Sequence, residues 1–166
     1  MHEFRRFDAE FIKFGVELLL EWVPNASFDA TIAYTYQRFV FEEFATGGDD
    51  FAGNDEPGAP PHRVFGGVSY TASFGLRSGL NVRWVDEYVL NNANTVTNWA
   101  YTIVDLRFGW DARWGDTDVR PFIGIDNLLD ERYNSSAITN AFGGRYYEPS
   151  PGREVYGGLT FGFGVR

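Results

Sequence analysis

Hydrophobic and polar residues alternate with a period of two along most of the chain. From Ile12 to Trp22 the even positions are apolar and the odd positions are mostly charged or small, and a second such segment runs from Phe28 to Gln37. Because successive side chains of a β-strand point to opposite faces, each segment predicts a strand with one apolar face. The turn-forming residues Pro24–Ser27 between them predict a hairpin.

The same alternation returns five more times and predicts seven strands in all. The further strands are expected at about 63–74, 80–88, 104–111, 119–127 and 154–165. Short turns are predicted at Arg77–Gly79 and Trp114–Thr117. A long polar loop is predicted at 46–61, where no periodicity is found. The predicted fold class is therefore all-β, an antiparallel meander of about seven long strands.

The connections alternate between short and long, which favours part of a transmembrane β-barrel. Turns near residues 25, 78 and 116 fall at one end of the meander, and loops near 53, 94 and 141 fall at the other. Outer-membrane barrels combine short periplasmic turns with long external loops. Most segments also reach the ~9–11 residues that cross a bilayer. An interfacial girdle is expected from aromatic residues near strand ends, namely Trp22, Tyr36, Trp84, Tyr88, Tyr101 and Trp114.

Two other architectures remain open on the residues alone. A soluble β-sandwich binding module has the same alternation, with its apolar faces packed against each other. A small self-contained outer-membrane barrel would add an eighth strand from residues 3 to 11. A transmembrane helix is not expected, because no stretch approaches ~20 apolar residues. The start, Met1–Arg6, also lacks the apolar core of a secretory signal.

Composition and charge exclude several classes of function. Acidic residues outnumber basic ones 23 to 14, so a nucleic-acid partner is not predicted. The chain has no Cys and only two His, which excludes thiolate and His-rich metal sites. No nucleophile elbow of the G-x-S-x-G type is present, so no enzymatic activity and no cofactor are predicted.

Charged residues form two notable groups. Asp105, Arg107, Asp111 and Arg113 share one face of their strand and are expected to pair with neighbouring strands in a structural ladder. One loop offers oxygen ligands for a hard cation, but without EF-hand spacing, so no metal site is predicted. The weak candidates in that loop are Asp49, Asp50, Asp55 and Glu56.

Two segments near the C-terminal end resemble motifs of TonB-dependent outer-membrane receptors. Pro121–Tyr133 contains N-L-L-D-E-R-Y, similar to the family's N-L-F-D-E-x-Y with Leu129 where Phe is usual. Gly144–Leu159 contains P-G-R, similar to the element that leads into the family's final strand. Weaker similarity, in Gly15–Leu18, Pro60–Arg63 and Ala100–Leu106, extends the resemblance over nearly the whole chain.

This resemblance implies a membrane receptor rather than a soluble protein. Members are plugged barrels of about 22 strands that import siderophores, cobalamin or similar scarce nutrients with energy from TonB. Residues 1–166 then correspond to the C-terminal segment of the barrel, without the plug domain. The implied partners are outer-membrane lipid, the remaining strands and plug, a small-molecule nutrient, and TonB through the missing N-terminal part. The implied location is the outer membrane of a Gram-negative bacterium.

The external loops of the family help to capture ligand, which suggests binding residues in this chain. The alternative interpretation is that the same residues are turn formers that pack against neighbouring loops. The candidates are Asn91, Asn92, Tyr133, Asn134, Arg145, Tyr146 and Tyr147.

Overall fold

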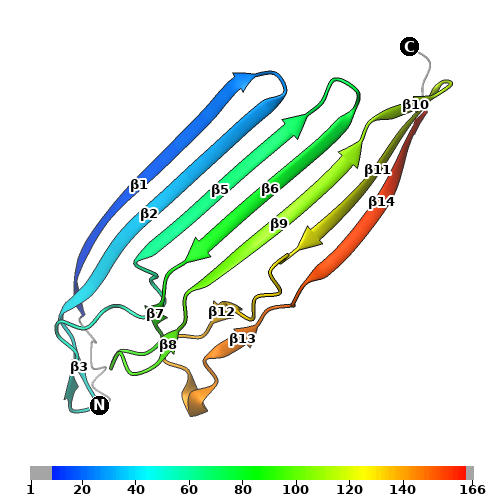
Figure 1. Ribbon diagram of the computed structural model, residues 1–166. Coiled ribbons are helices and arrows are strands. Elements are labelled where there is room, and N and C mark those ends of the chain that lie inside the picture. Colours follow the sequence, from blue (N-terminus) through cyan, green and yellow to red (C-terminus); the bar gives the residue numbers. More distant parts are fainter. Residues whose placement is uncertain (1–8, 164–166) are drawn as a thin grey trace.

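Seven long antiparallel strands form one continuous sheet in the computed structural model, which describes residues 9–163 (Figure 1). Each long strand pairs with the long strand that precedes it in the chain, so the predicted all-β meander is confirmed. The strands are β1 (Glu10–Asn25), β2 (Phe28–Glu43), β5 (His62–Thr71), β6 (Leu76–Val85), β9 (Tyr101–Trp110), β11 (Thr117–Asp126) and β14 (Glu154–Phe163).

Short elements occupy the predicted loops. Three two-stranded pieces lie there: β3 (Ala45–Thr46) with β4 (Asp49–Asp50), β7 (Tyr88–Val89) with β8 (Thr97–Asn98), and β12 (Asn134–Ala137) with β13 (Tyr147–Pro149). Strand β10 (Ala112–Trp114) pairs with the start of β11. The helical segment η1 (Phe142–Gly144) has three residues, and no helix within residues 9–163 is long and apolar enough to cross a membrane.

The two ends of the sheet differ as expected. Short turns join β1 to β2, β5 to β6 and β10 to β11 at one end, and loops 44–61, 86–100 and 127–153 lie at the other (Figure 1). The predicted turn at Arg77–Gly79 is wrong, because these residues belong to β6 and pair with Thr71, Tyr70 and Ser69. The turn lies at 72–75 instead, where Gly75 has a φ of 101°.

The register of the pairs gives the sheet one apolar and one polar face. Leu20, Ile32, Gly66, Val82 and Val104 form one row across five strands. The adjacent row, on the opposite face, consists of Glu21, Thr31, Gly67, Asn81 and Asp105. The pairing carries this division across the sheet, so we name these surfaces the apolar face and the polar face.

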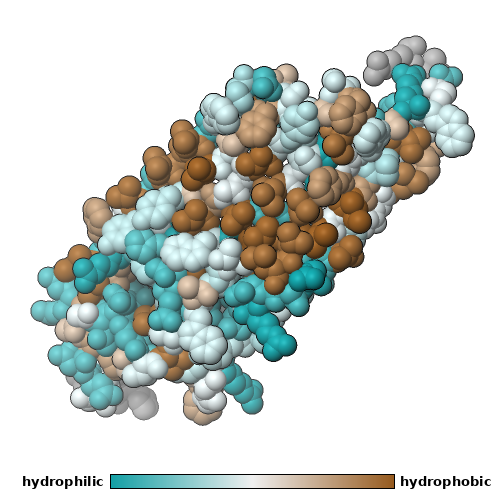
Figure 2. Space-filling view, in the orientation of Figure 1, coloured by the Kyte–Doolittle hydropathy of each residue, from teal (hydrophilic) through white to brown (hydrophobic). Residues whose placement is uncertain are grey.

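Large side chains of the apolar face lie open to the surroundings. Leu18 is 59% exposed, Leu20 58% and Leu159 53%. Figure 2 shows hydrophobic residues gathered over the long strands and hydrophilic residues at the loop end. A β-sandwich would bury such residues between two sheets. The sandwich interpretation is therefore wrong, because a single large sheet leaves its apolar face uncovered.

The sheet does not close on itself within residues 9–163. Strand β1 pairs with β2 alone among the described strands, and β14 pairs with β11 alone. Most of the expected eighth strand, residues 3 to 8, lies outside the described residues, and Glu10 and Phe11 belong to β1. The described residues thus form an open wall with two free edges, rather than the closed small barrel of the second alternative.

Aromatic residues gather toward both ends of the apolar face. At the turn end Phe74 packs on Trp110 with ring centroids 5.3 Å apart, and Trp22 packs on Phe28 at 5.5 Å. At the loop end Phe14 packs on Tyr36 at 6.0 Å. These positions suit an interfacial girdle.

Tyr101, which was also predicted for this girdle, lies elsewhere. Tyr101 pairs in register with Val85, which pairs with Arg63 on the polar face. Its ring packs on Tyr133 at the loop end, with centroids 4.8 Å apart. The reason is the strand parity, because an odd position of β9 points away from the apolar side.

Candidate functional site

Ion pairs cross the polar face near its turn end. Asp111 lies 2.9 Å from the Arg77 guanidinium on β6 and 3.6 Å from Arg120 on β11. Arg113 pairs within its own hairpin, with Asp116 at 3.8 Å. The predicted ladder is therefore present for Asp111, whereas Arg113 uses a partner in the adjacent turn. Because these side chains are about half exposed, we assign the pairs a small share of the stability.

Tyr156 connects the last three long strands on the polar face. Its hydroxyl accepts a hydrogen bond of 2.6 Å from Arg107 Nε on β9 and donates one of 3.3 Å to Asp126 on β11. Its ring lies across Gly124, where a Cβ would overlap the ring atoms. Glycine at position 124 therefore lets Tyr156 lie flat on the sheet and present its hydroxyl to both neighbours.

A hollow of about 680 Å³ opens beside this cluster. Its lining includes Gly79 and Gly109 together with Arg77, Arg107 and Tyr156. In a closed barrel the polar face would face the interior, because the opposite face is apolar. The hollow would then be part of the wall of a lumen.

The three long loops are joined by asparagine side chains. Asn94, at a φ of 54°, accepts a 2.8 Å hydrogen bond from Asp55 N and donates one of 2.9 Å to Asp55 O. Asn92 and Asn140 exchange two bonds, of 3.0 and 2.9 Å. Loop 86–100 therefore holds both loop 44–61 and loop 127–153, and we name this assembly the loop block.

Buried amides hold the base of the loop block. Asn98 is 1% exposed and donates to the Tyr88 hydroxyl at 3.0 Å. Its Oδ1 accepts a 3.0 Å bond from Asn134 Nδ2. The Tyr147 hydroxyl donates to Thr97 O at 2.9 Å. Because a buried amide left without partners is costly, these bonds hold β8 and β12 together.

We expect Asn98→Ala to loosen the loop block without unfolding the sheet. The change leaves the Asn134 amide without its buried acceptor, which should cost about 1–2 kcal/mol of local stability. Amide hydrogen exchange in segments 88–98 and 134–147 should become faster, while exchange in β5 and β6 stays the same. Ser136→Ala, an exposed change in β12, is the control, and equal exchange in both variants would contradict this role of Asn98.

The two motifs that suggested the family contact each other. Asn127, 3% exposed and at a φ of 52°, accepts a bond from Glu131 N and donates one to Glu131 O, each of 2.9 Å. Asp130 then accepts a 2.9 Å bond from Arg153 N. The N-L-L-D-E turn thereby holds the end of the P-G-R element, at the point where the chain enters β14.

The candidate ligand residues have several kinds of surroundings. The side chains of Asn91, Asn92 and Asn134 form hydrogen bonds within or between loops, and the Tyr147 hydroxyl donates to Thr97 O. Tyr133 packs on Tyr101 and Tyr146 packs beside Tyr147, whereas Arg145 is exposed. Ligand binding by these residues stays a prediction.

Two exposed aromatic residues at the loop end escaped the sequence analysis. Trp99 is 77% exposed and Phe142 is 98% exposed. A large aromatic residue inside a polar loop is the signal that would have found them. Both are available to contact a ligand or another part of the protein.

The acidic residues of loop 44–61 have separate roles. Asp50 accepts a bond from Ala52 N at 3.0 Å, and Glu56 forms an ion pair of 2.9 Å with Lys13. The paired Glu56 oxygen is buried, with no hydrogen bond of good geometry among the described residues, so Lys13 balances its charge. Within residues 9–163 no group of three or more acidic or His side chains is arranged to hold a metal ion.

An open antiparallel wall with one apolar face, one polar face and long loops at one end defines a segment of an outer-membrane-type β-barrel. A family model described as TonB dependent receptor-like, beta-barrel, matches residues 13–128, which is most of the chain. The chain therefore belongs to the TonB-dependent receptor β-barrel family. This family consists of transport receptors, not enzymes, in the outer membrane of Gram-negative bacteria.

Relatives and solved structures are similar along most of this chain. The ferrioxamine receptor of Yersinia enterocolitica is 25% identical over 131 residues, which cover 77% of this chain and 18% of that protein. The siderophore receptor PiuA of Acinetobacter baumannii has a TM-score of 0.75 at 21% identity, covering 92% of this chain and 22% of that one. The ferric preacinetobactin receptor BauA of the same species has a TM-score of 0.77 at 17% identity. The match covers 93% of this chain and 22% of BauA. The chain spans about a fifth of the length of these proteins.

Proposed function

We propose that this chain is the C-terminal wall segment of an outer-membrane receptor that imports a siderophore or a similar scarce nutrient with energy from TonB. The remaining strands and the plug would come from outside this segment. They would pair with the free edges of β1 and β14, because hydrocarbon cannot satisfy exposed backbone groups.

The main support for this proposal is the single sheet with one apolar and one polar face. An uncovered apolar face fits lipid, and a continuous polar face fits a lumen that passes a polar nutrient. The names of the relatives support the class of nutrient, since the similar proteins are described as receptors for ferrioxamine, siderophores and ferric preacinetobactin.

Ligand capture would use the exposed side chains of the loop end. Arg145, Tyr147, Trp99 and Phe142 are exposed there. The loop block holds its loops together, which reduces the entropy lost when a ligand binds. We therefore favour Arg145, Trp99 and Phe142 over the other candidates, because the side chains of Asn91, Asn92, Asn134 and Tyr147 already form loop contacts.

Growth under iron limitation tests the transport function. The full reading frame that contains this chain would be expressed in a Gram-negative strain that lacks its own siderophore receptors. We expect growth with one class among ferric hydroxamates, ferric catecholates, ferric carboxylates and haem, and cobalamin uptake would be measured separately. Growth or uptake should disappear in a strain without TonB.

The control is a double variant, Arg145→Ala with Phe142→Ala, made in the same receptor. We expect the double variant to reach the outer membrane at the normal level and to need at least tenfold more nutrient. A receptor that is present in the outer membrane but supports no uptake of any of these nutrients would refute the proposed function.

A further inference from the structure

Two arginines of the polar face are neighbours near its loop end. Arg63 on β5 pairs in register with Val85, and Arg83 on β6 pairs with Phe65. The two arginines are therefore diagonal neighbours on one face, a relation that places Cβ atoms about 7–8 Å apart. Both side chains are exposed. Two positive charges thus lie together on the wall, directly below the long loops.

The arginines of the loop end differ from those of the turn end in their partners. At the turn end Arg77 pairs with Asp111 at 2.9 Å, and Arg120 lies 3.6 Å from the same carboxylate. The ion pairs formed among residues 9–163 include neither Arg63 nor Arg83. Because like charges on neighbouring strands repel, an anion placed between these two guanidinium groups would be favoured.

The acidic side chains near this arginine pair have other partners. Asp105 on β9 lies one row closer to the turn end than Arg83, and it accepts a 2.9 Å hydrogen bond from Asn127 N. Asp86, which follows β6, accepts a 2.9 Å bond from Glu87 N. Both carboxylates are therefore held by backbone N–H groups instead of by the arginines.

Tyrosine hydroxyls border the arginine pair. Tyr101 on β9 lies in the same row as Arg63. The side chains whose charges act on its hydroxyl include Arg63, Arg83, Tyr88 and Tyr133. The ring of Tyr133 also packs on that of Tyr101, with centroids 4.8 Å apart. Guanidinium and phenol groups both donate hydrogen bonds, so this part of the wall offers several donors to one anion.

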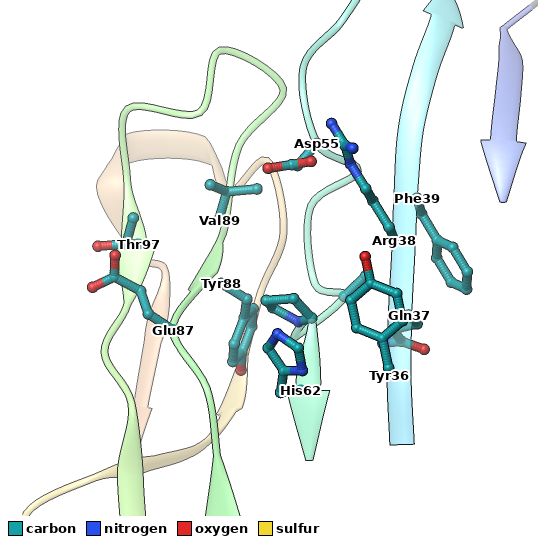
Figure 3. Close-up of a pocket in the computed structure, with 12 residues that line it drawn as sticks. Tyr36, Gln37, Arg38, Phe39, Asp55, His62, Glu87, Tyr88, Val89 and Thr97 are labelled. Atoms are coloured by element: carbon teal, nitrogen blue, oxygen red, sulfur yellow. The ribbon is translucent and has the colours of Figure 1, made fainter. Parts of the chain in front are cut away.

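A pocket of about 410 Å³ lies beside this site, between the loop end of β2 and the β7–β8 pair (Figure 3). Its lining includes His62, which precedes Arg63 in the chain, and Tyr88 on the β7 side. Asp55 and Glu87 also line it, so the pocket itself has mixed charge. We therefore assign an anion to the arginine pair and not to this pocket.

We propose that Arg63 and Arg83 form a subsite in the lumen for the anionic oxygens of a negatively charged ferric chelate. The inference rests on the proposed transport function and names the charge class of its nutrient. Tyr101 and Tyr133 add hydroxyl donors. Catecholate and carboxylate groups both supply anionic oxygens, whereas a ferric tris-hydroxamate is neutral. Charge-assisted hydrogen bonds to the guanidinium groups favour the anionic chelates.

Binding of iron chelates to the full receptor in detergent tests this subsite. The probes, labelled with radioactive iron, are ferric enterobactin, a tris-catecholate anion, ferric citrate, a carboxylate anion, and ferrichrome, a neutral tris-hydroxamate. We expect one of the two anions to bind about tenfold tighter than ferrichrome, and that result also identifies the acidic group. Arg63→Gln and Arg83→Gln should each weaken binding of this anion about tenfold and leave ferrichrome binding unchanged.

Two further variants separate charge from structure. Arg83→Lys keeps the positive charge but loses the planar donor geometry, so we expect it to lose only about threefold in affinity for the anion. Arg113→Gln makes the same change as the test variants at the turn end of the polar face, where Arg113 pairs with Asp118 in register. This control should bind every chelate as the unaltered receptor does.

Ferrichrome that binds as tightly as both anions, or anion binding that is unchanged in both glutamine variants, would overturn the proposal. Equal weakening of anionic and neutral chelates would indicate a structural effect and would overturn it as well. Uptake that depends on TonB is scored separately. A receptor that imports ferrichrome but shows no preference for anions loses this inference alone, whereas a receptor that imports no nutrient refutes the proposed function.

Discussion

Arginine in place of Val82 is expected to prevent stable insertion of the wall, at a cost of about 2–4 kcal/mol in the free energy of unfolding from a bilayer. Val82 lies in the middle of the apolar face, between Gly66 and Val104 in the register. A charge there loses its hydration without gaining a partner. We would measure the heat-modifiable form of the receptor in outer membranes and its urea unfolding in lipid vesicles.

The adjacent residue supplies the control. Asn81→Arg places the same side chain on the polar face, next to Asp105 in the register. We expect it to insert normally and to lose less than about 0.5 kcal/mol, as most exposed substitutions do. If the two variants inserted equally well, the assignment of the apolar face to lipid would be wrong.

Gly75→Ala is expected to cost about 3 kcal/mol or more, because the turn between β5 and β6 accepts only glycine at this position. Gly75 has a φ of 101°, and a Cβ there would overlap the backbone carbonyl oxygen of Asp111. The Gly75 carbonyl also accepts a 2.8 Å hydrogen bond from Asp111 N. The strain would therefore reach β9 as well as the turn.

A glycine in a second turn distinguishes the cost of backbone strain from the cost of a steric clash. Gly115 also has a positive φ, of 61°, but nothing lies within 4 Å of a Cβ built there. Gly115→Ala should cost only about 1–2 kcal/mol, the penalty of the left-handed conformation itself. Urea unfolding of both variants in vesicles measures the difference, and equal losses would exclude the close approach of Asp111 as a cause.

The number of strands and their two faces followed from the sequence alone. Alternation from Ile12 to Trp22 and in six later segments is a local signal, since strand geometry sends neighbouring residues to opposite sides. The sequence also predicts the long polar loop at 46–61 as an irregular connection, because Gly, Pro, Asn and Asp disfavour regular strands. The motif at Asn127–Tyr133 indicates the family by resemblance and does not depend on any tertiary contact.

The turn before β6 illustrates what local signals miss. Arg77–Gly79 and Ser73–Gly75 each contain a serine and a glycine, so these turn-forming residues alone do not select one of them. The choice depends on Asp111, 36 residues later, whose backbone approaches Gly75. The position of Tyr101 was also missed by a local signal. Its odd position in β9 decides which face its side chain occupies, whereas its place near a strand end does not.

The sequence by itself determined the strands, their alternating faces and the long-loop end of this protein. The tertiary structure decided that the apolar face stays uncovered, that Asp130 meets Arg153, and that Asn92, Asn94 and Asn98 hold three loops together. The physical reason is distance along the chain. Periodicity and turn chemistry act between near neighbours, whereas these contacts join residues 23 to 48 positions apart and exist only when the sheet has brought its loops to one end.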